Sequence, residues 1–155
     1  MYFIISFLIL ALDLFTKYLV QKNMQPYQTI PVIDNIFHIT YVQNTGAAFS
    51  ILKGKTLFFT MVSSVVILAI VLILIKHPIK NKVFRIVIAM ILGGAIGNLV
   101  DRLRFGYVVD FLDFRVWPVF NIADCAIVVG ALILAYFITF HPDFQSLHSK
   151  NGGKP

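Results

Sequence analysis

The stretch TLFFTMVSSVVILAIVLILI, residues Thr56–Ile75, decides the fold class of this chain. It contains 20 residues without a charged side chain. At a helical rise of ~1.5 Å per residue, such a segment spans the ~30 Å hydrocarbon core of a bilayer. The stretch therefore predicts a transmembrane helix, and with it an integral membrane protein.

Three further apolar runs surround this helix. The first, Met1–Val20, lacks the basic start and the small-residue cleavage site of a removable signal peptide, so we expect it to remain as a helix. Val83–Val100 holds Gly93 and Gly97 at a spacing that lets helix backbones approach closely in lipid, which predicts a helix packed inside a bundle. The fourth run extends from about Val119 to Phe140.

The composition agrees with this assignment. Of the 155 residues, 59% are apolar and only 13% are charged, whereas soluble domains carry ~25% charged residues. The net charge of +6 comes from 13 Lys and Arg against seven Asp. These basic residues are spread through the connectors between apolar runs, so we expect anionic membrane lipids, and no nucleic acid, as their partner. The single cysteine, Cys125, excludes an internal disulfide.

We expect one integral membrane domain over residues 1–155, all-α, with four transmembrane helices and a small extracytoplasmic β-sheet. The helices are expected at about 1–22, 56–76, 83–102 and 119–140, and the β segment at about 27–54. Within that segment, Ile36–Val42 is rich in β-branched and aromatic residues and ends at a turn, which predicts a strand. A second short strand is predicted over Ala48–Leu52, and residues 141–155 are predicted to form a flexible tail.

The orientation follows from the shortest connector. Lys76–Arg85 carries four basic residues and no acid in ten positions, which indicates a cytoplasmic loop. With four helices, both termini then lie in the cytoplasm. Asp101, Asp110 and Asp124 come at the outer membrane boundary.

These carboxylates are the main sign of function. Asp110 and Asp124 are separated by 13 residues at the outer ends of two antiparallel helices, so both belong at one membrane depth. Carboxylates held beside lipid are costly and are seldom idle. Two of them in contact share one proton, because both cannot ionise in a poorly solvated site. The pattern is typical of aspartyl hydrolase chemistry, which needs neither metal nor cofactor.

The motifs resemble those of the bacterial lipoprotein signal peptidases, or type II signal peptidases. Asp13–Lys17 is similar to the first motif of that family, and Gln43–Ser50 is similar to the second. Gly93–Arg102, followed by Val108–Phe111, resembles the third, and Phe120–Asp124 resembles the last. The four motifs come in the family's order and cover nearly the whole chain.

The resemblance implies a four-helix bundle with a small β-cradle and a catalytic dyad of Asp110 and Asp124. It implies an intramembrane aspartic endopeptidase that cuts diacylglyceryl-modified prolipoproteins just before the lipidated cysteine. It also implies inhibition by the cyclic peptide globomycin and a location in the bacterial cytoplasmic membrane with the active site near the outer face. We expect the enzyme to act as a monomer.

The other matched residues receive roles that make physical sense. Substrate backbone groups in a partly dry groove need hydrogen-bond partners, and the expected ligands are Asn44, Gly46 and Arg102. Asn98 and Asn121 each precede an aspartate by three positions and are expected to orient it.

The remaining matched residues are expected to support the site. Asp101 is expected to neutralise Arg102 or Arg104. For Asp13 and Lys17, an i, i+4 ion pair and a role in fixing the first helix near the site remain equal alternatives. Ala123 completes the set of supporting residues.

Other candidates have simpler interpretations. Cys125 has no histidine near it in sequence and is expected to be a small buried residue, not a nucleophile. The four histidines lack ligand spacing, so no metal site is predicted. Asp113 and Arg115 are expected to form a solvated pair.

One alternative role for the dyad aspartates and two alternative functions for the protein remain open. The aspartates would belong to a structural ion-pair network with Arg102, to an ion-coupled transporter, or to a non-catalytic membrane adaptor. Against a transporter, the acids gather at one interface and not at the membrane midplane. Cleavage of a lipidated precursor without added metal separates a peptidase from a transporter and from an adaptor.

Overall fold

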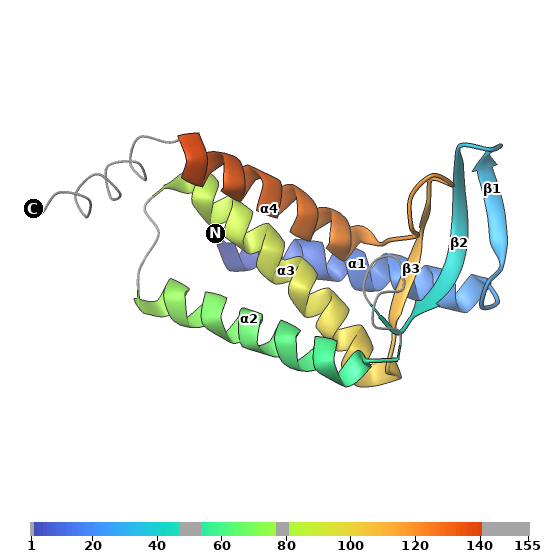
Figure 1. The fold of residues 1–155 in the computed structure, drawn as a ribbon, viewed down its shortest axis with the longest axis horizontal. Helices are drawn as coiled ribbons and strands as arrows, with labels where there is room; N and C mark the ends of the chain where they lie inside the picture. Colours follow the sequence, from blue (N-terminus) through green and yellow to red (C-terminus); the bar gives the residue numbers. More distant parts are fainter. Residues whose placement is uncertain (1, 47–53, 77–80, 141–155) are drawn as a thin grey trace, which may run out of the picture.

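The computed structural model describes residues 2–46, 54–76 and 81–140. Figure 1 shows the long helices lying side by side and a small sheet at one end of them. The elements follow in the order α1 (Tyr2–Asn23), β1 (Thr29–Ile33), β2 (Phe37–Asn44), α2 (Thr56–Lys76), α3 (Lys82–Phe105), β3 (Val108–Asp113) and α4 (Ile122–Phe140).

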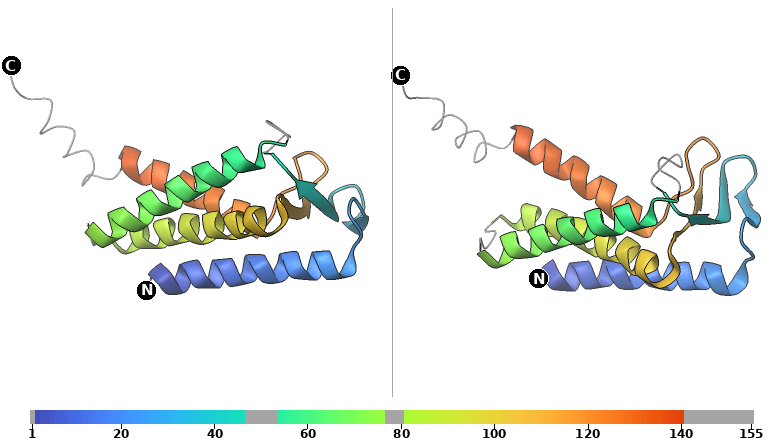
Figure 2. Two further views of the ribbon diagram at one scale, coloured as in Figure 1. Left: turned by 90° about the horizontal axis from the view of Figure 1, so that it is seen from below. Right: turned by 60° about the horizontal axis from the view of Figure 1, so that its bottom comes forward.

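Within the described residues, four helices are long and apolar enough to cross a membrane: Phe3–Asn23, Thr56–Lys76, Lys82–Phe105 and Ile122–Phe140. Large apolar side chains are exposed along these helices, which suits contact with lipid and not with water. Figure 2 shows from two further directions that the sheet stands at one end, while the start of α1 and the end of α4 lie at the other. The predicted fold class, four transmembrane helices with a small sheet, is confirmed.

The sheet is antiparallel, with strand order β1-β2-β3. Along β2 and β3, Val42 lies opposite Asp110 and Asn44 lies opposite Val108. The register shifts between Ile39 and Val42, so a bulge interrupts the ladder just before the position opposite Asp110. This pairing brings the carboxylate of β3 to the end of β2 that carries Asn44.

The sequence interpretation of the sheet needs three corrections. The predicted strand Ile36–Val42 is found at Phe37–Asn44. The strand β1 lies within the predicted β segment 27–54 but was not predicted as a separate strand. The strand β3 was not predicted, and Asp110 lies in it and not at the outer end of the third helix. The strand predicted at Ala48–Leu52 falls outside the described residues, as does the tail 141–155.

Small residues allow α3 to pack closely on two other helices. A methyl group added at Gly93 would lie 2.7 Å from the carbonyl oxygen of Ser6 on α1, and one at Gly94 would lie 2.5 Å from the carbonyl oxygen of Ala123 on α4. Both distances are shorter than a van der Waals contact, so neither position accepts a side chain without moving a helix backbone. The predicted close packing of this helix is confirmed.

The helix ends position the site. The third helix continues to Phe105, beyond the predicted end at 102, and stops where Gly106 adopts a left-handed conformation with φ 77°. The strand β3 begins two residues later. The fourth helix begins at Ile122, three residues later than predicted, because Asn121 caps it: the Asn121 side-chain oxygen accepts the backbone N–H of Asp124 at 2.9 Å.

A small apolar cluster fixes the sheet to the helices. Val20 and Met24 at the end of α1 are buried together with Tyr41 of β2 and with Val109 and Phe111 of β3. Asp110 lies between two of these residues, so its neighbours in sequence anchor it on both sides. This packing therefore fixes the position of Asp110 relative to the ends of the helices.

Candidate active site

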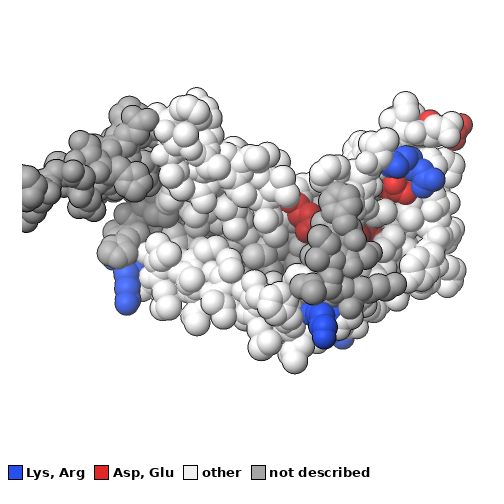
Figure 3. Space-filling view, viewed as in Figure 1, with Lys and Arg blue, Asp and Glu red and all other residues white. Residues whose placement is uncertain are grey.

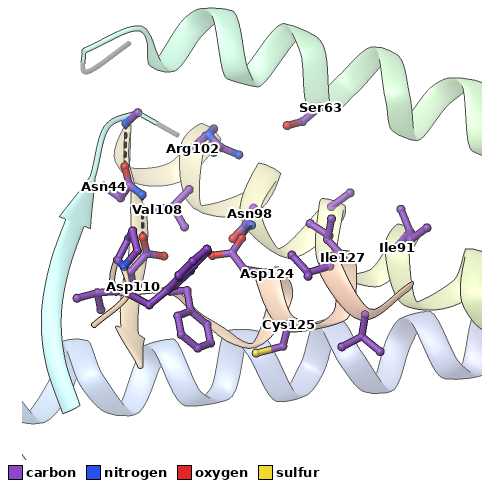
Figure 4. Close-up of a pocket in the computed structure, with 18 of the residues that line it drawn as sticks. Asn44, Ser63, Ile91, Asn98, Arg102, Val108, Asp110, Asp124, Cys125 and Ile127 are labelled. Atoms are coloured by element: carbon purple, nitrogen blue, oxygen red, sulfur yellow. Dashed lines mark hydrogen bonds between the residues drawn. The ribbon is translucent and has the colours of Figure 1, made fainter. Parts of the chain in front are cut away.

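A groove of about 820 Å³ opens between α2, α3, α4 and the sheet. Apolar side chains make up most of its wall, including Val62, Val66 and Ile127. Figure 4 shows Asp110 and Asp124 close together at the end of the groove nearest the sheet. In Figure 3, acidic atoms likewise appear where the helices meet the sheet, on a face that is otherwise mostly uncharged.

Asp110 comes from β3 and is 1% exposed. Both of its carboxylate oxygens accept a hydrogen bond: Asn44 Nδ2 donates to Oδ2 at 2.8 Å, and Asn121 Nδ2 donates to Oδ1 at 2.6 Å. Burial, together with the negative charge of Asp124, raises the pKa of Asp110 to about 7, although the hydrogen bonds from the Asn44 and Asn121 side chains oppose the shift. Near neutral pH, this carboxyl group is therefore able both to hold and to release a proton.

Asp124 lies in the first turn of α4, where the helix dipole favours a negative charge. Its Oδ1 accepts a hydrogen bond from Asn98 Nδ2 at 2.7 Å. The structure thus brings together the two carboxylates that the sequence paired, one from the sheet and one from a helix.

The two asparagines act differently from the sequence prediction. We expected Asn98 to orient Asp101 and Asn121 to orient Asp124, each along its own helix. Instead, the Asn98 amide contacts Asp124 on α4, and the Asn121 amide nitrogen contacts Asp110 on β3. Both amides contact a carboxylate, but the contacts cross between elements because α3, β3 and α4 converge there.

A buried ionic cluster lies behind Asp110 and Asp124. Lys17 Nζ lies 2.8 Å from Asp13 Oδ2 and 3.0 Å from Asp101 Oδ2, and all three residues are at most 2% exposed. Asp13 Oδ1 also accepts the backbone N–H of the fully buried Ala123 at 2.9 Å. The two alternatives for Asp13 and Lys17 therefore hold together, since the pair forms and also ties α1 to α3 and α4.

Asp101 has partners other than those expected. Its Oδ2 contacts Lys17 and accepts the backbone N–H of Val109 at 3.0 Å. Arg102 points into the groove, and its guanidinium lies 5.6 Å from the ring centroid of Phe59. The expectation that Asp101 pairs with Arg102 or Arg104 is thus replaced by a link between α1, α3 and β3.

The expected substrate ligands line the groove. Gly46 is buried at its edge, and its backbone N–H donates to Asn44 Oδ1 at 2.9 Å. Both ends of the Asn44 amide are therefore engaged, one with Gly46 and one with Asp110. In this arrangement Asn44 holds the carboxylate of Asp110, a contact that the sequence interpretation missed.

Two other candidates can be placed in the structure. Cys125 lines the groove beside Asp124, partly buried, and within the described ranges no three His, Cys, Asp or Glu side chains group as metal ligands do. Asp113 and Arg115 do form an ion pair at 3.1 Å, but Asp113 is only 4% exposed. The expectation of a solvated pair is wrong for Asp113, because the Thr40 hydroxyl donates to it at 2.7 Å within the sheet.

Comparison with known proteins identifies the family. The family model described as signal peptidase (SPase) II matches residues 5–140. A lipoprotein signal peptidase of Caldanaerobacter subterraneus subsp. tengcongensis is 53% identical over 138 residues, which cover 88% of this chain and 94% of that protein. One of Moorella thermoacetica is 49% identical over 135 residues, which cover 87% and 90%.

Two solved structures have the same fold. One, described as a bacterial membrane enzyme at 2.3 Å resolution, superposes with a TM-score of 0.82 at 32% identity and covers 91% of this chain and 90% of its own. A second, at 1.9 Å resolution, gives a TM-score of 0.81 at 31% identity and covers 90% and 93%. These similarities leave the transporter and adaptor alternatives without support, and the chain belongs to the signal peptidase (SPase) II family, the lipoprotein signal peptidases.

Proposed function

We propose that this lipoprotein signal peptidase is an aspartic endopeptidase in which Asp110 and Asp124 activate water. The observation that carries the proposal is the convergence of these two carboxylates, from β3 and α4, at the end of one apolar groove. The pKa of Asp110, raised to about 7 by burial and by the charge of Asp124, favours a pair that holds one proton near neutral pH.

The reaction follows from that protonation state. The ionised carboxylate takes a proton from a water molecule as the water oxygen attacks the scissile carbonyl carbon. The protonated carboxyl group donates its proton to the carbonyl oxygen, which becomes the hydroxyl of a tetrahedral intermediate. When the C–N bond breaks, the leaving amine receives a proton from the dyad, and a hydroxyl group of the intermediate returns its proton to the dyad as the carboxylic acid of the product forms, so the dyad again holds one proton. The five residues that surround the dyad keep it in place: Asn44, Asn98, Asn121, Asp13 and Lys17.

The substrate that fits the groove is apolar and extended. We infer a prolipoprotein whose cysteine carries diacylglycerol, with the cut just before that cysteine. The apolar walls of α2, α3 and α4 suit a signal peptide and acyl chains, whereas Arg102 and Gly46 lie near the dyad, where substrate carbonyl groups need donors. Globomycin, a cyclic peptide of similar character, is expected to compete for the same groove.

The membrane orientation is inferred from charge. Lys76 ends α2, and Lys82 and Arg85 lie in the first turn of α3. These helix ends lie at the opposite end of the molecule from the dyad. Basic short loops stay in the cytoplasm. We therefore infer cytoplasmic termini and an active site near the outer face. We also infer a single domain that acts as a monomer, because one chain supplies every side chain of the site described above.

Product analysis tests the proposal. The purified protein is incubated in detergent with a diacylated precursor and with the same precursor lacking lipid, and the products are identified by mass. We expect cleavage of the lipidated precursor only, directly before its cysteine, and unchanged rates in the presence of a chelator. Asp110→Asn and Asp124→Asn should each lose more than ~10³-fold in rate while still binding precursor. More than a tenth of wild-type activity in either variant would exclude the dyad.

A further inference from the structure

The side-chain amide of Asn98 has one allowed orientation. Lys17 Nζ lies 3.0 Å from Asn98 Oδ1. An ammonium group has three donors and no acceptor, so the amide atom that faces it must be the oxygen. The amide nitrogen then faces the other way, 2.7 Å from Asp124 Oδ1. A half-turn of the amide would place NH₂ against ammonium and a carbonyl oxygen against a carboxylate, two repulsive contacts.

Asn98 Oδ1 is also linked to Asp110, the other carboxylate of the dyad, through the Asn121 side chain. Asn121 Nδ2 lies 3.1 Å from Asn98 Oδ1 and 2.6 Å from Asp110 Oδ1. The Asn121 oxygen accepts the backbone N–H of Asp124, so this second amide is fixed as well. Lys17 is therefore connected to each dyad carboxylate through asparagine side chains.

Lys17 has no freedom to make other contacts. It is 1% exposed, and its three N–H groups have three acceptors: Asp13, Asp101 and Asn98. An ion pair that only joined α1 to α3 would be complete with the two carboxylates. The third N–H is directed at the amide that contacts the dyad.

We propose that Lys17 is a positioning residue for the peptidase reaction, because its ammonium group sets the rotation of the Asn98 amide and its charge favours the ionised form of the dyad. This inference rests on the proposed function, since it takes Asp110 and Asp124 as the reacting groups. Lys17 acts through Asn98 and is not itself a catalytic residue.

The charge around the dyad makes the inference measurable. The titratable and charged side chains around Asp110 of β3 and Asp124 of α4 are Asp13 and Lys17 on α1, Asp101 and Arg102 on α3, and Cys125 on α4, with Tyr107, just before β3, beside Asp101. Of the two cations, Lys17 is buried and Arg102 faces the groove. Loss of the buried cation makes the dyad harder to ionise, so the acid limb of the pH profile should move to higher pH.

The experiment compares Lys17→Met, Lys17→Arg and Lys22→Met by measuring kcat and KM for a diacylated precursor as a function of pH. Lys22 lies on the same helix, is exposed and contacts the Tyr18 ring, so it serves as the control. We expect Lys17→Met to lower kcat at least ~10-fold with KM nearly unchanged and to move the acid limb up by about one pH unit. Lys17→Arg should restore the wild-type acid limb, and Lys22→Met should match wild type throughout.

A second variant decides the matter if Lys17→Met does not fold, since that change leaves Asp13 and Asp101 uncompensated. Asn98→Asp keeps an acceptor for Lys17 but removes the donor to Asp124. We expect a folded protein whose kcat falls more than ~10-fold. Retention of half the wild-type kcat by Asn98→Asp, or a Lys17→Met variant that folds with an unchanged pH profile, would overturn the inference. Activity in Asp110→Asn or Asp124→Asn would instead overturn the proposed function, whatever the Lys17 variants do.

Discussion

Helices α2 and α3 are similar in length and both are apolar enough to cross a membrane, yet they are built for different surroundings. Of the 21 residues of α2, all of which the structure describes, only Leu74 is buried. In α3, eight residues are buried, and they include three glycines, Asn98 and Asp101. The difference teaches that the helix with the stronger transmembrane signal contributes least to the protein interior, because lipid, and not protein, satisfies its side chains.

The first way to break this comparison is to give both helices the same large side chain. Gly97→Leu should abolish folding, since even a methyl group at Gly97 would collide with the carboxylate of Asp13. Ala69→Leu on α2, at an exposed position, should leave the melting temperature unchanged. Thermal unfolding in detergent measures both. A Gly97→Leu protein that melts within a few degrees of wild type would mean that α3 does not pack as closely as described.

The second prediction concerns the pH dependence of stability, which the buried Asp110 beside α3 should control. The carboxyl group of Asp110 has a pKa of about 7 in the folded protein and ~3.9 when unfolded. Its stabilising contribution is therefore complete below about pH 4 and disappears as the pH rises towards 7, a fall of up to about 4 kcal/mol in the free energy of unfolding. In Asp110→Asn this fall should be absent. Melting curves of wild type and variant from pH 4 to 8 check the sign, and parallel curves would contradict it.

The third prediction tests the buried interior of α3 at one carboxylate, Asp101. Asp101→Asn leaves Lys17 with one carboxylate partner instead of two and weakens the acceptor for Val109 N–H. We expect a loss of about 3 kcal/mol in stability with reduced but measurable cleavage, because the buried charge of Lys17 is less well compensated. The control is Asp34→Asn in the exposed turn between β1 and β2, which should be silent. A stable but inactive Asp101→Asn would give Asp101 a direct catalytic role.

The smallest effect is expected at Cys125, which follows Asp124 on α4 and faces the groove. Cys125→Ser preserves size, and the thiol has no part in the proposed reaction. Stability should change by less than about 0.5 kcal/mol and cleavage by less than twofold. Rates on the lipidated precursor measure this, and a loss comparable to that of the dyad variants would contradict the assignment.

The sequence was informative wherever a local pattern carries the signal. The uncharged run from Thr56 predicted α2 almost to its ends, and the spacing of Gly93 and Gly97 predicted the packing of α3. The order of the motifs identified both residues of the proposed dyad. The two helix features depend on composition and spacing within one element, and the dyad residues were identified from motifs that are each a short local stretch of sequence.

Features that depend on contacts between distant segments were missed. The strand β3 forms only because β2 pairs with it, and its run of Val, Phe and Leu is too short to distinguish from a helix end. The contact of Asn98 with Asp124 instead of Asp101 was missed for the same reason, since Asn98 and Asp124 are 26 residues apart in the sequence. The start of α4 is different: an asparagine before an apolar run is a recognised N-cap signal, and Asn121 carried that signal.

The engagement of the polar side chains around the dyad has a consequence for drug resistance. Asn44, Asn98 and Asn121 each have both ends of the amide hydrogen-bonded within the protein. A substitution there that weakens a competitive inhibitor therefore also disturbs a carboxylate, and the enzyme loses activity with it. Escape should instead arise in the aliphatic wall, at Val62, Val66 or Val128, where exchange between similar apolar residues costs little. Sequencing of variants selected under an inhibitor would locate the changes, and viable substitutions concentrated at the three asparagines would contradict this expectation.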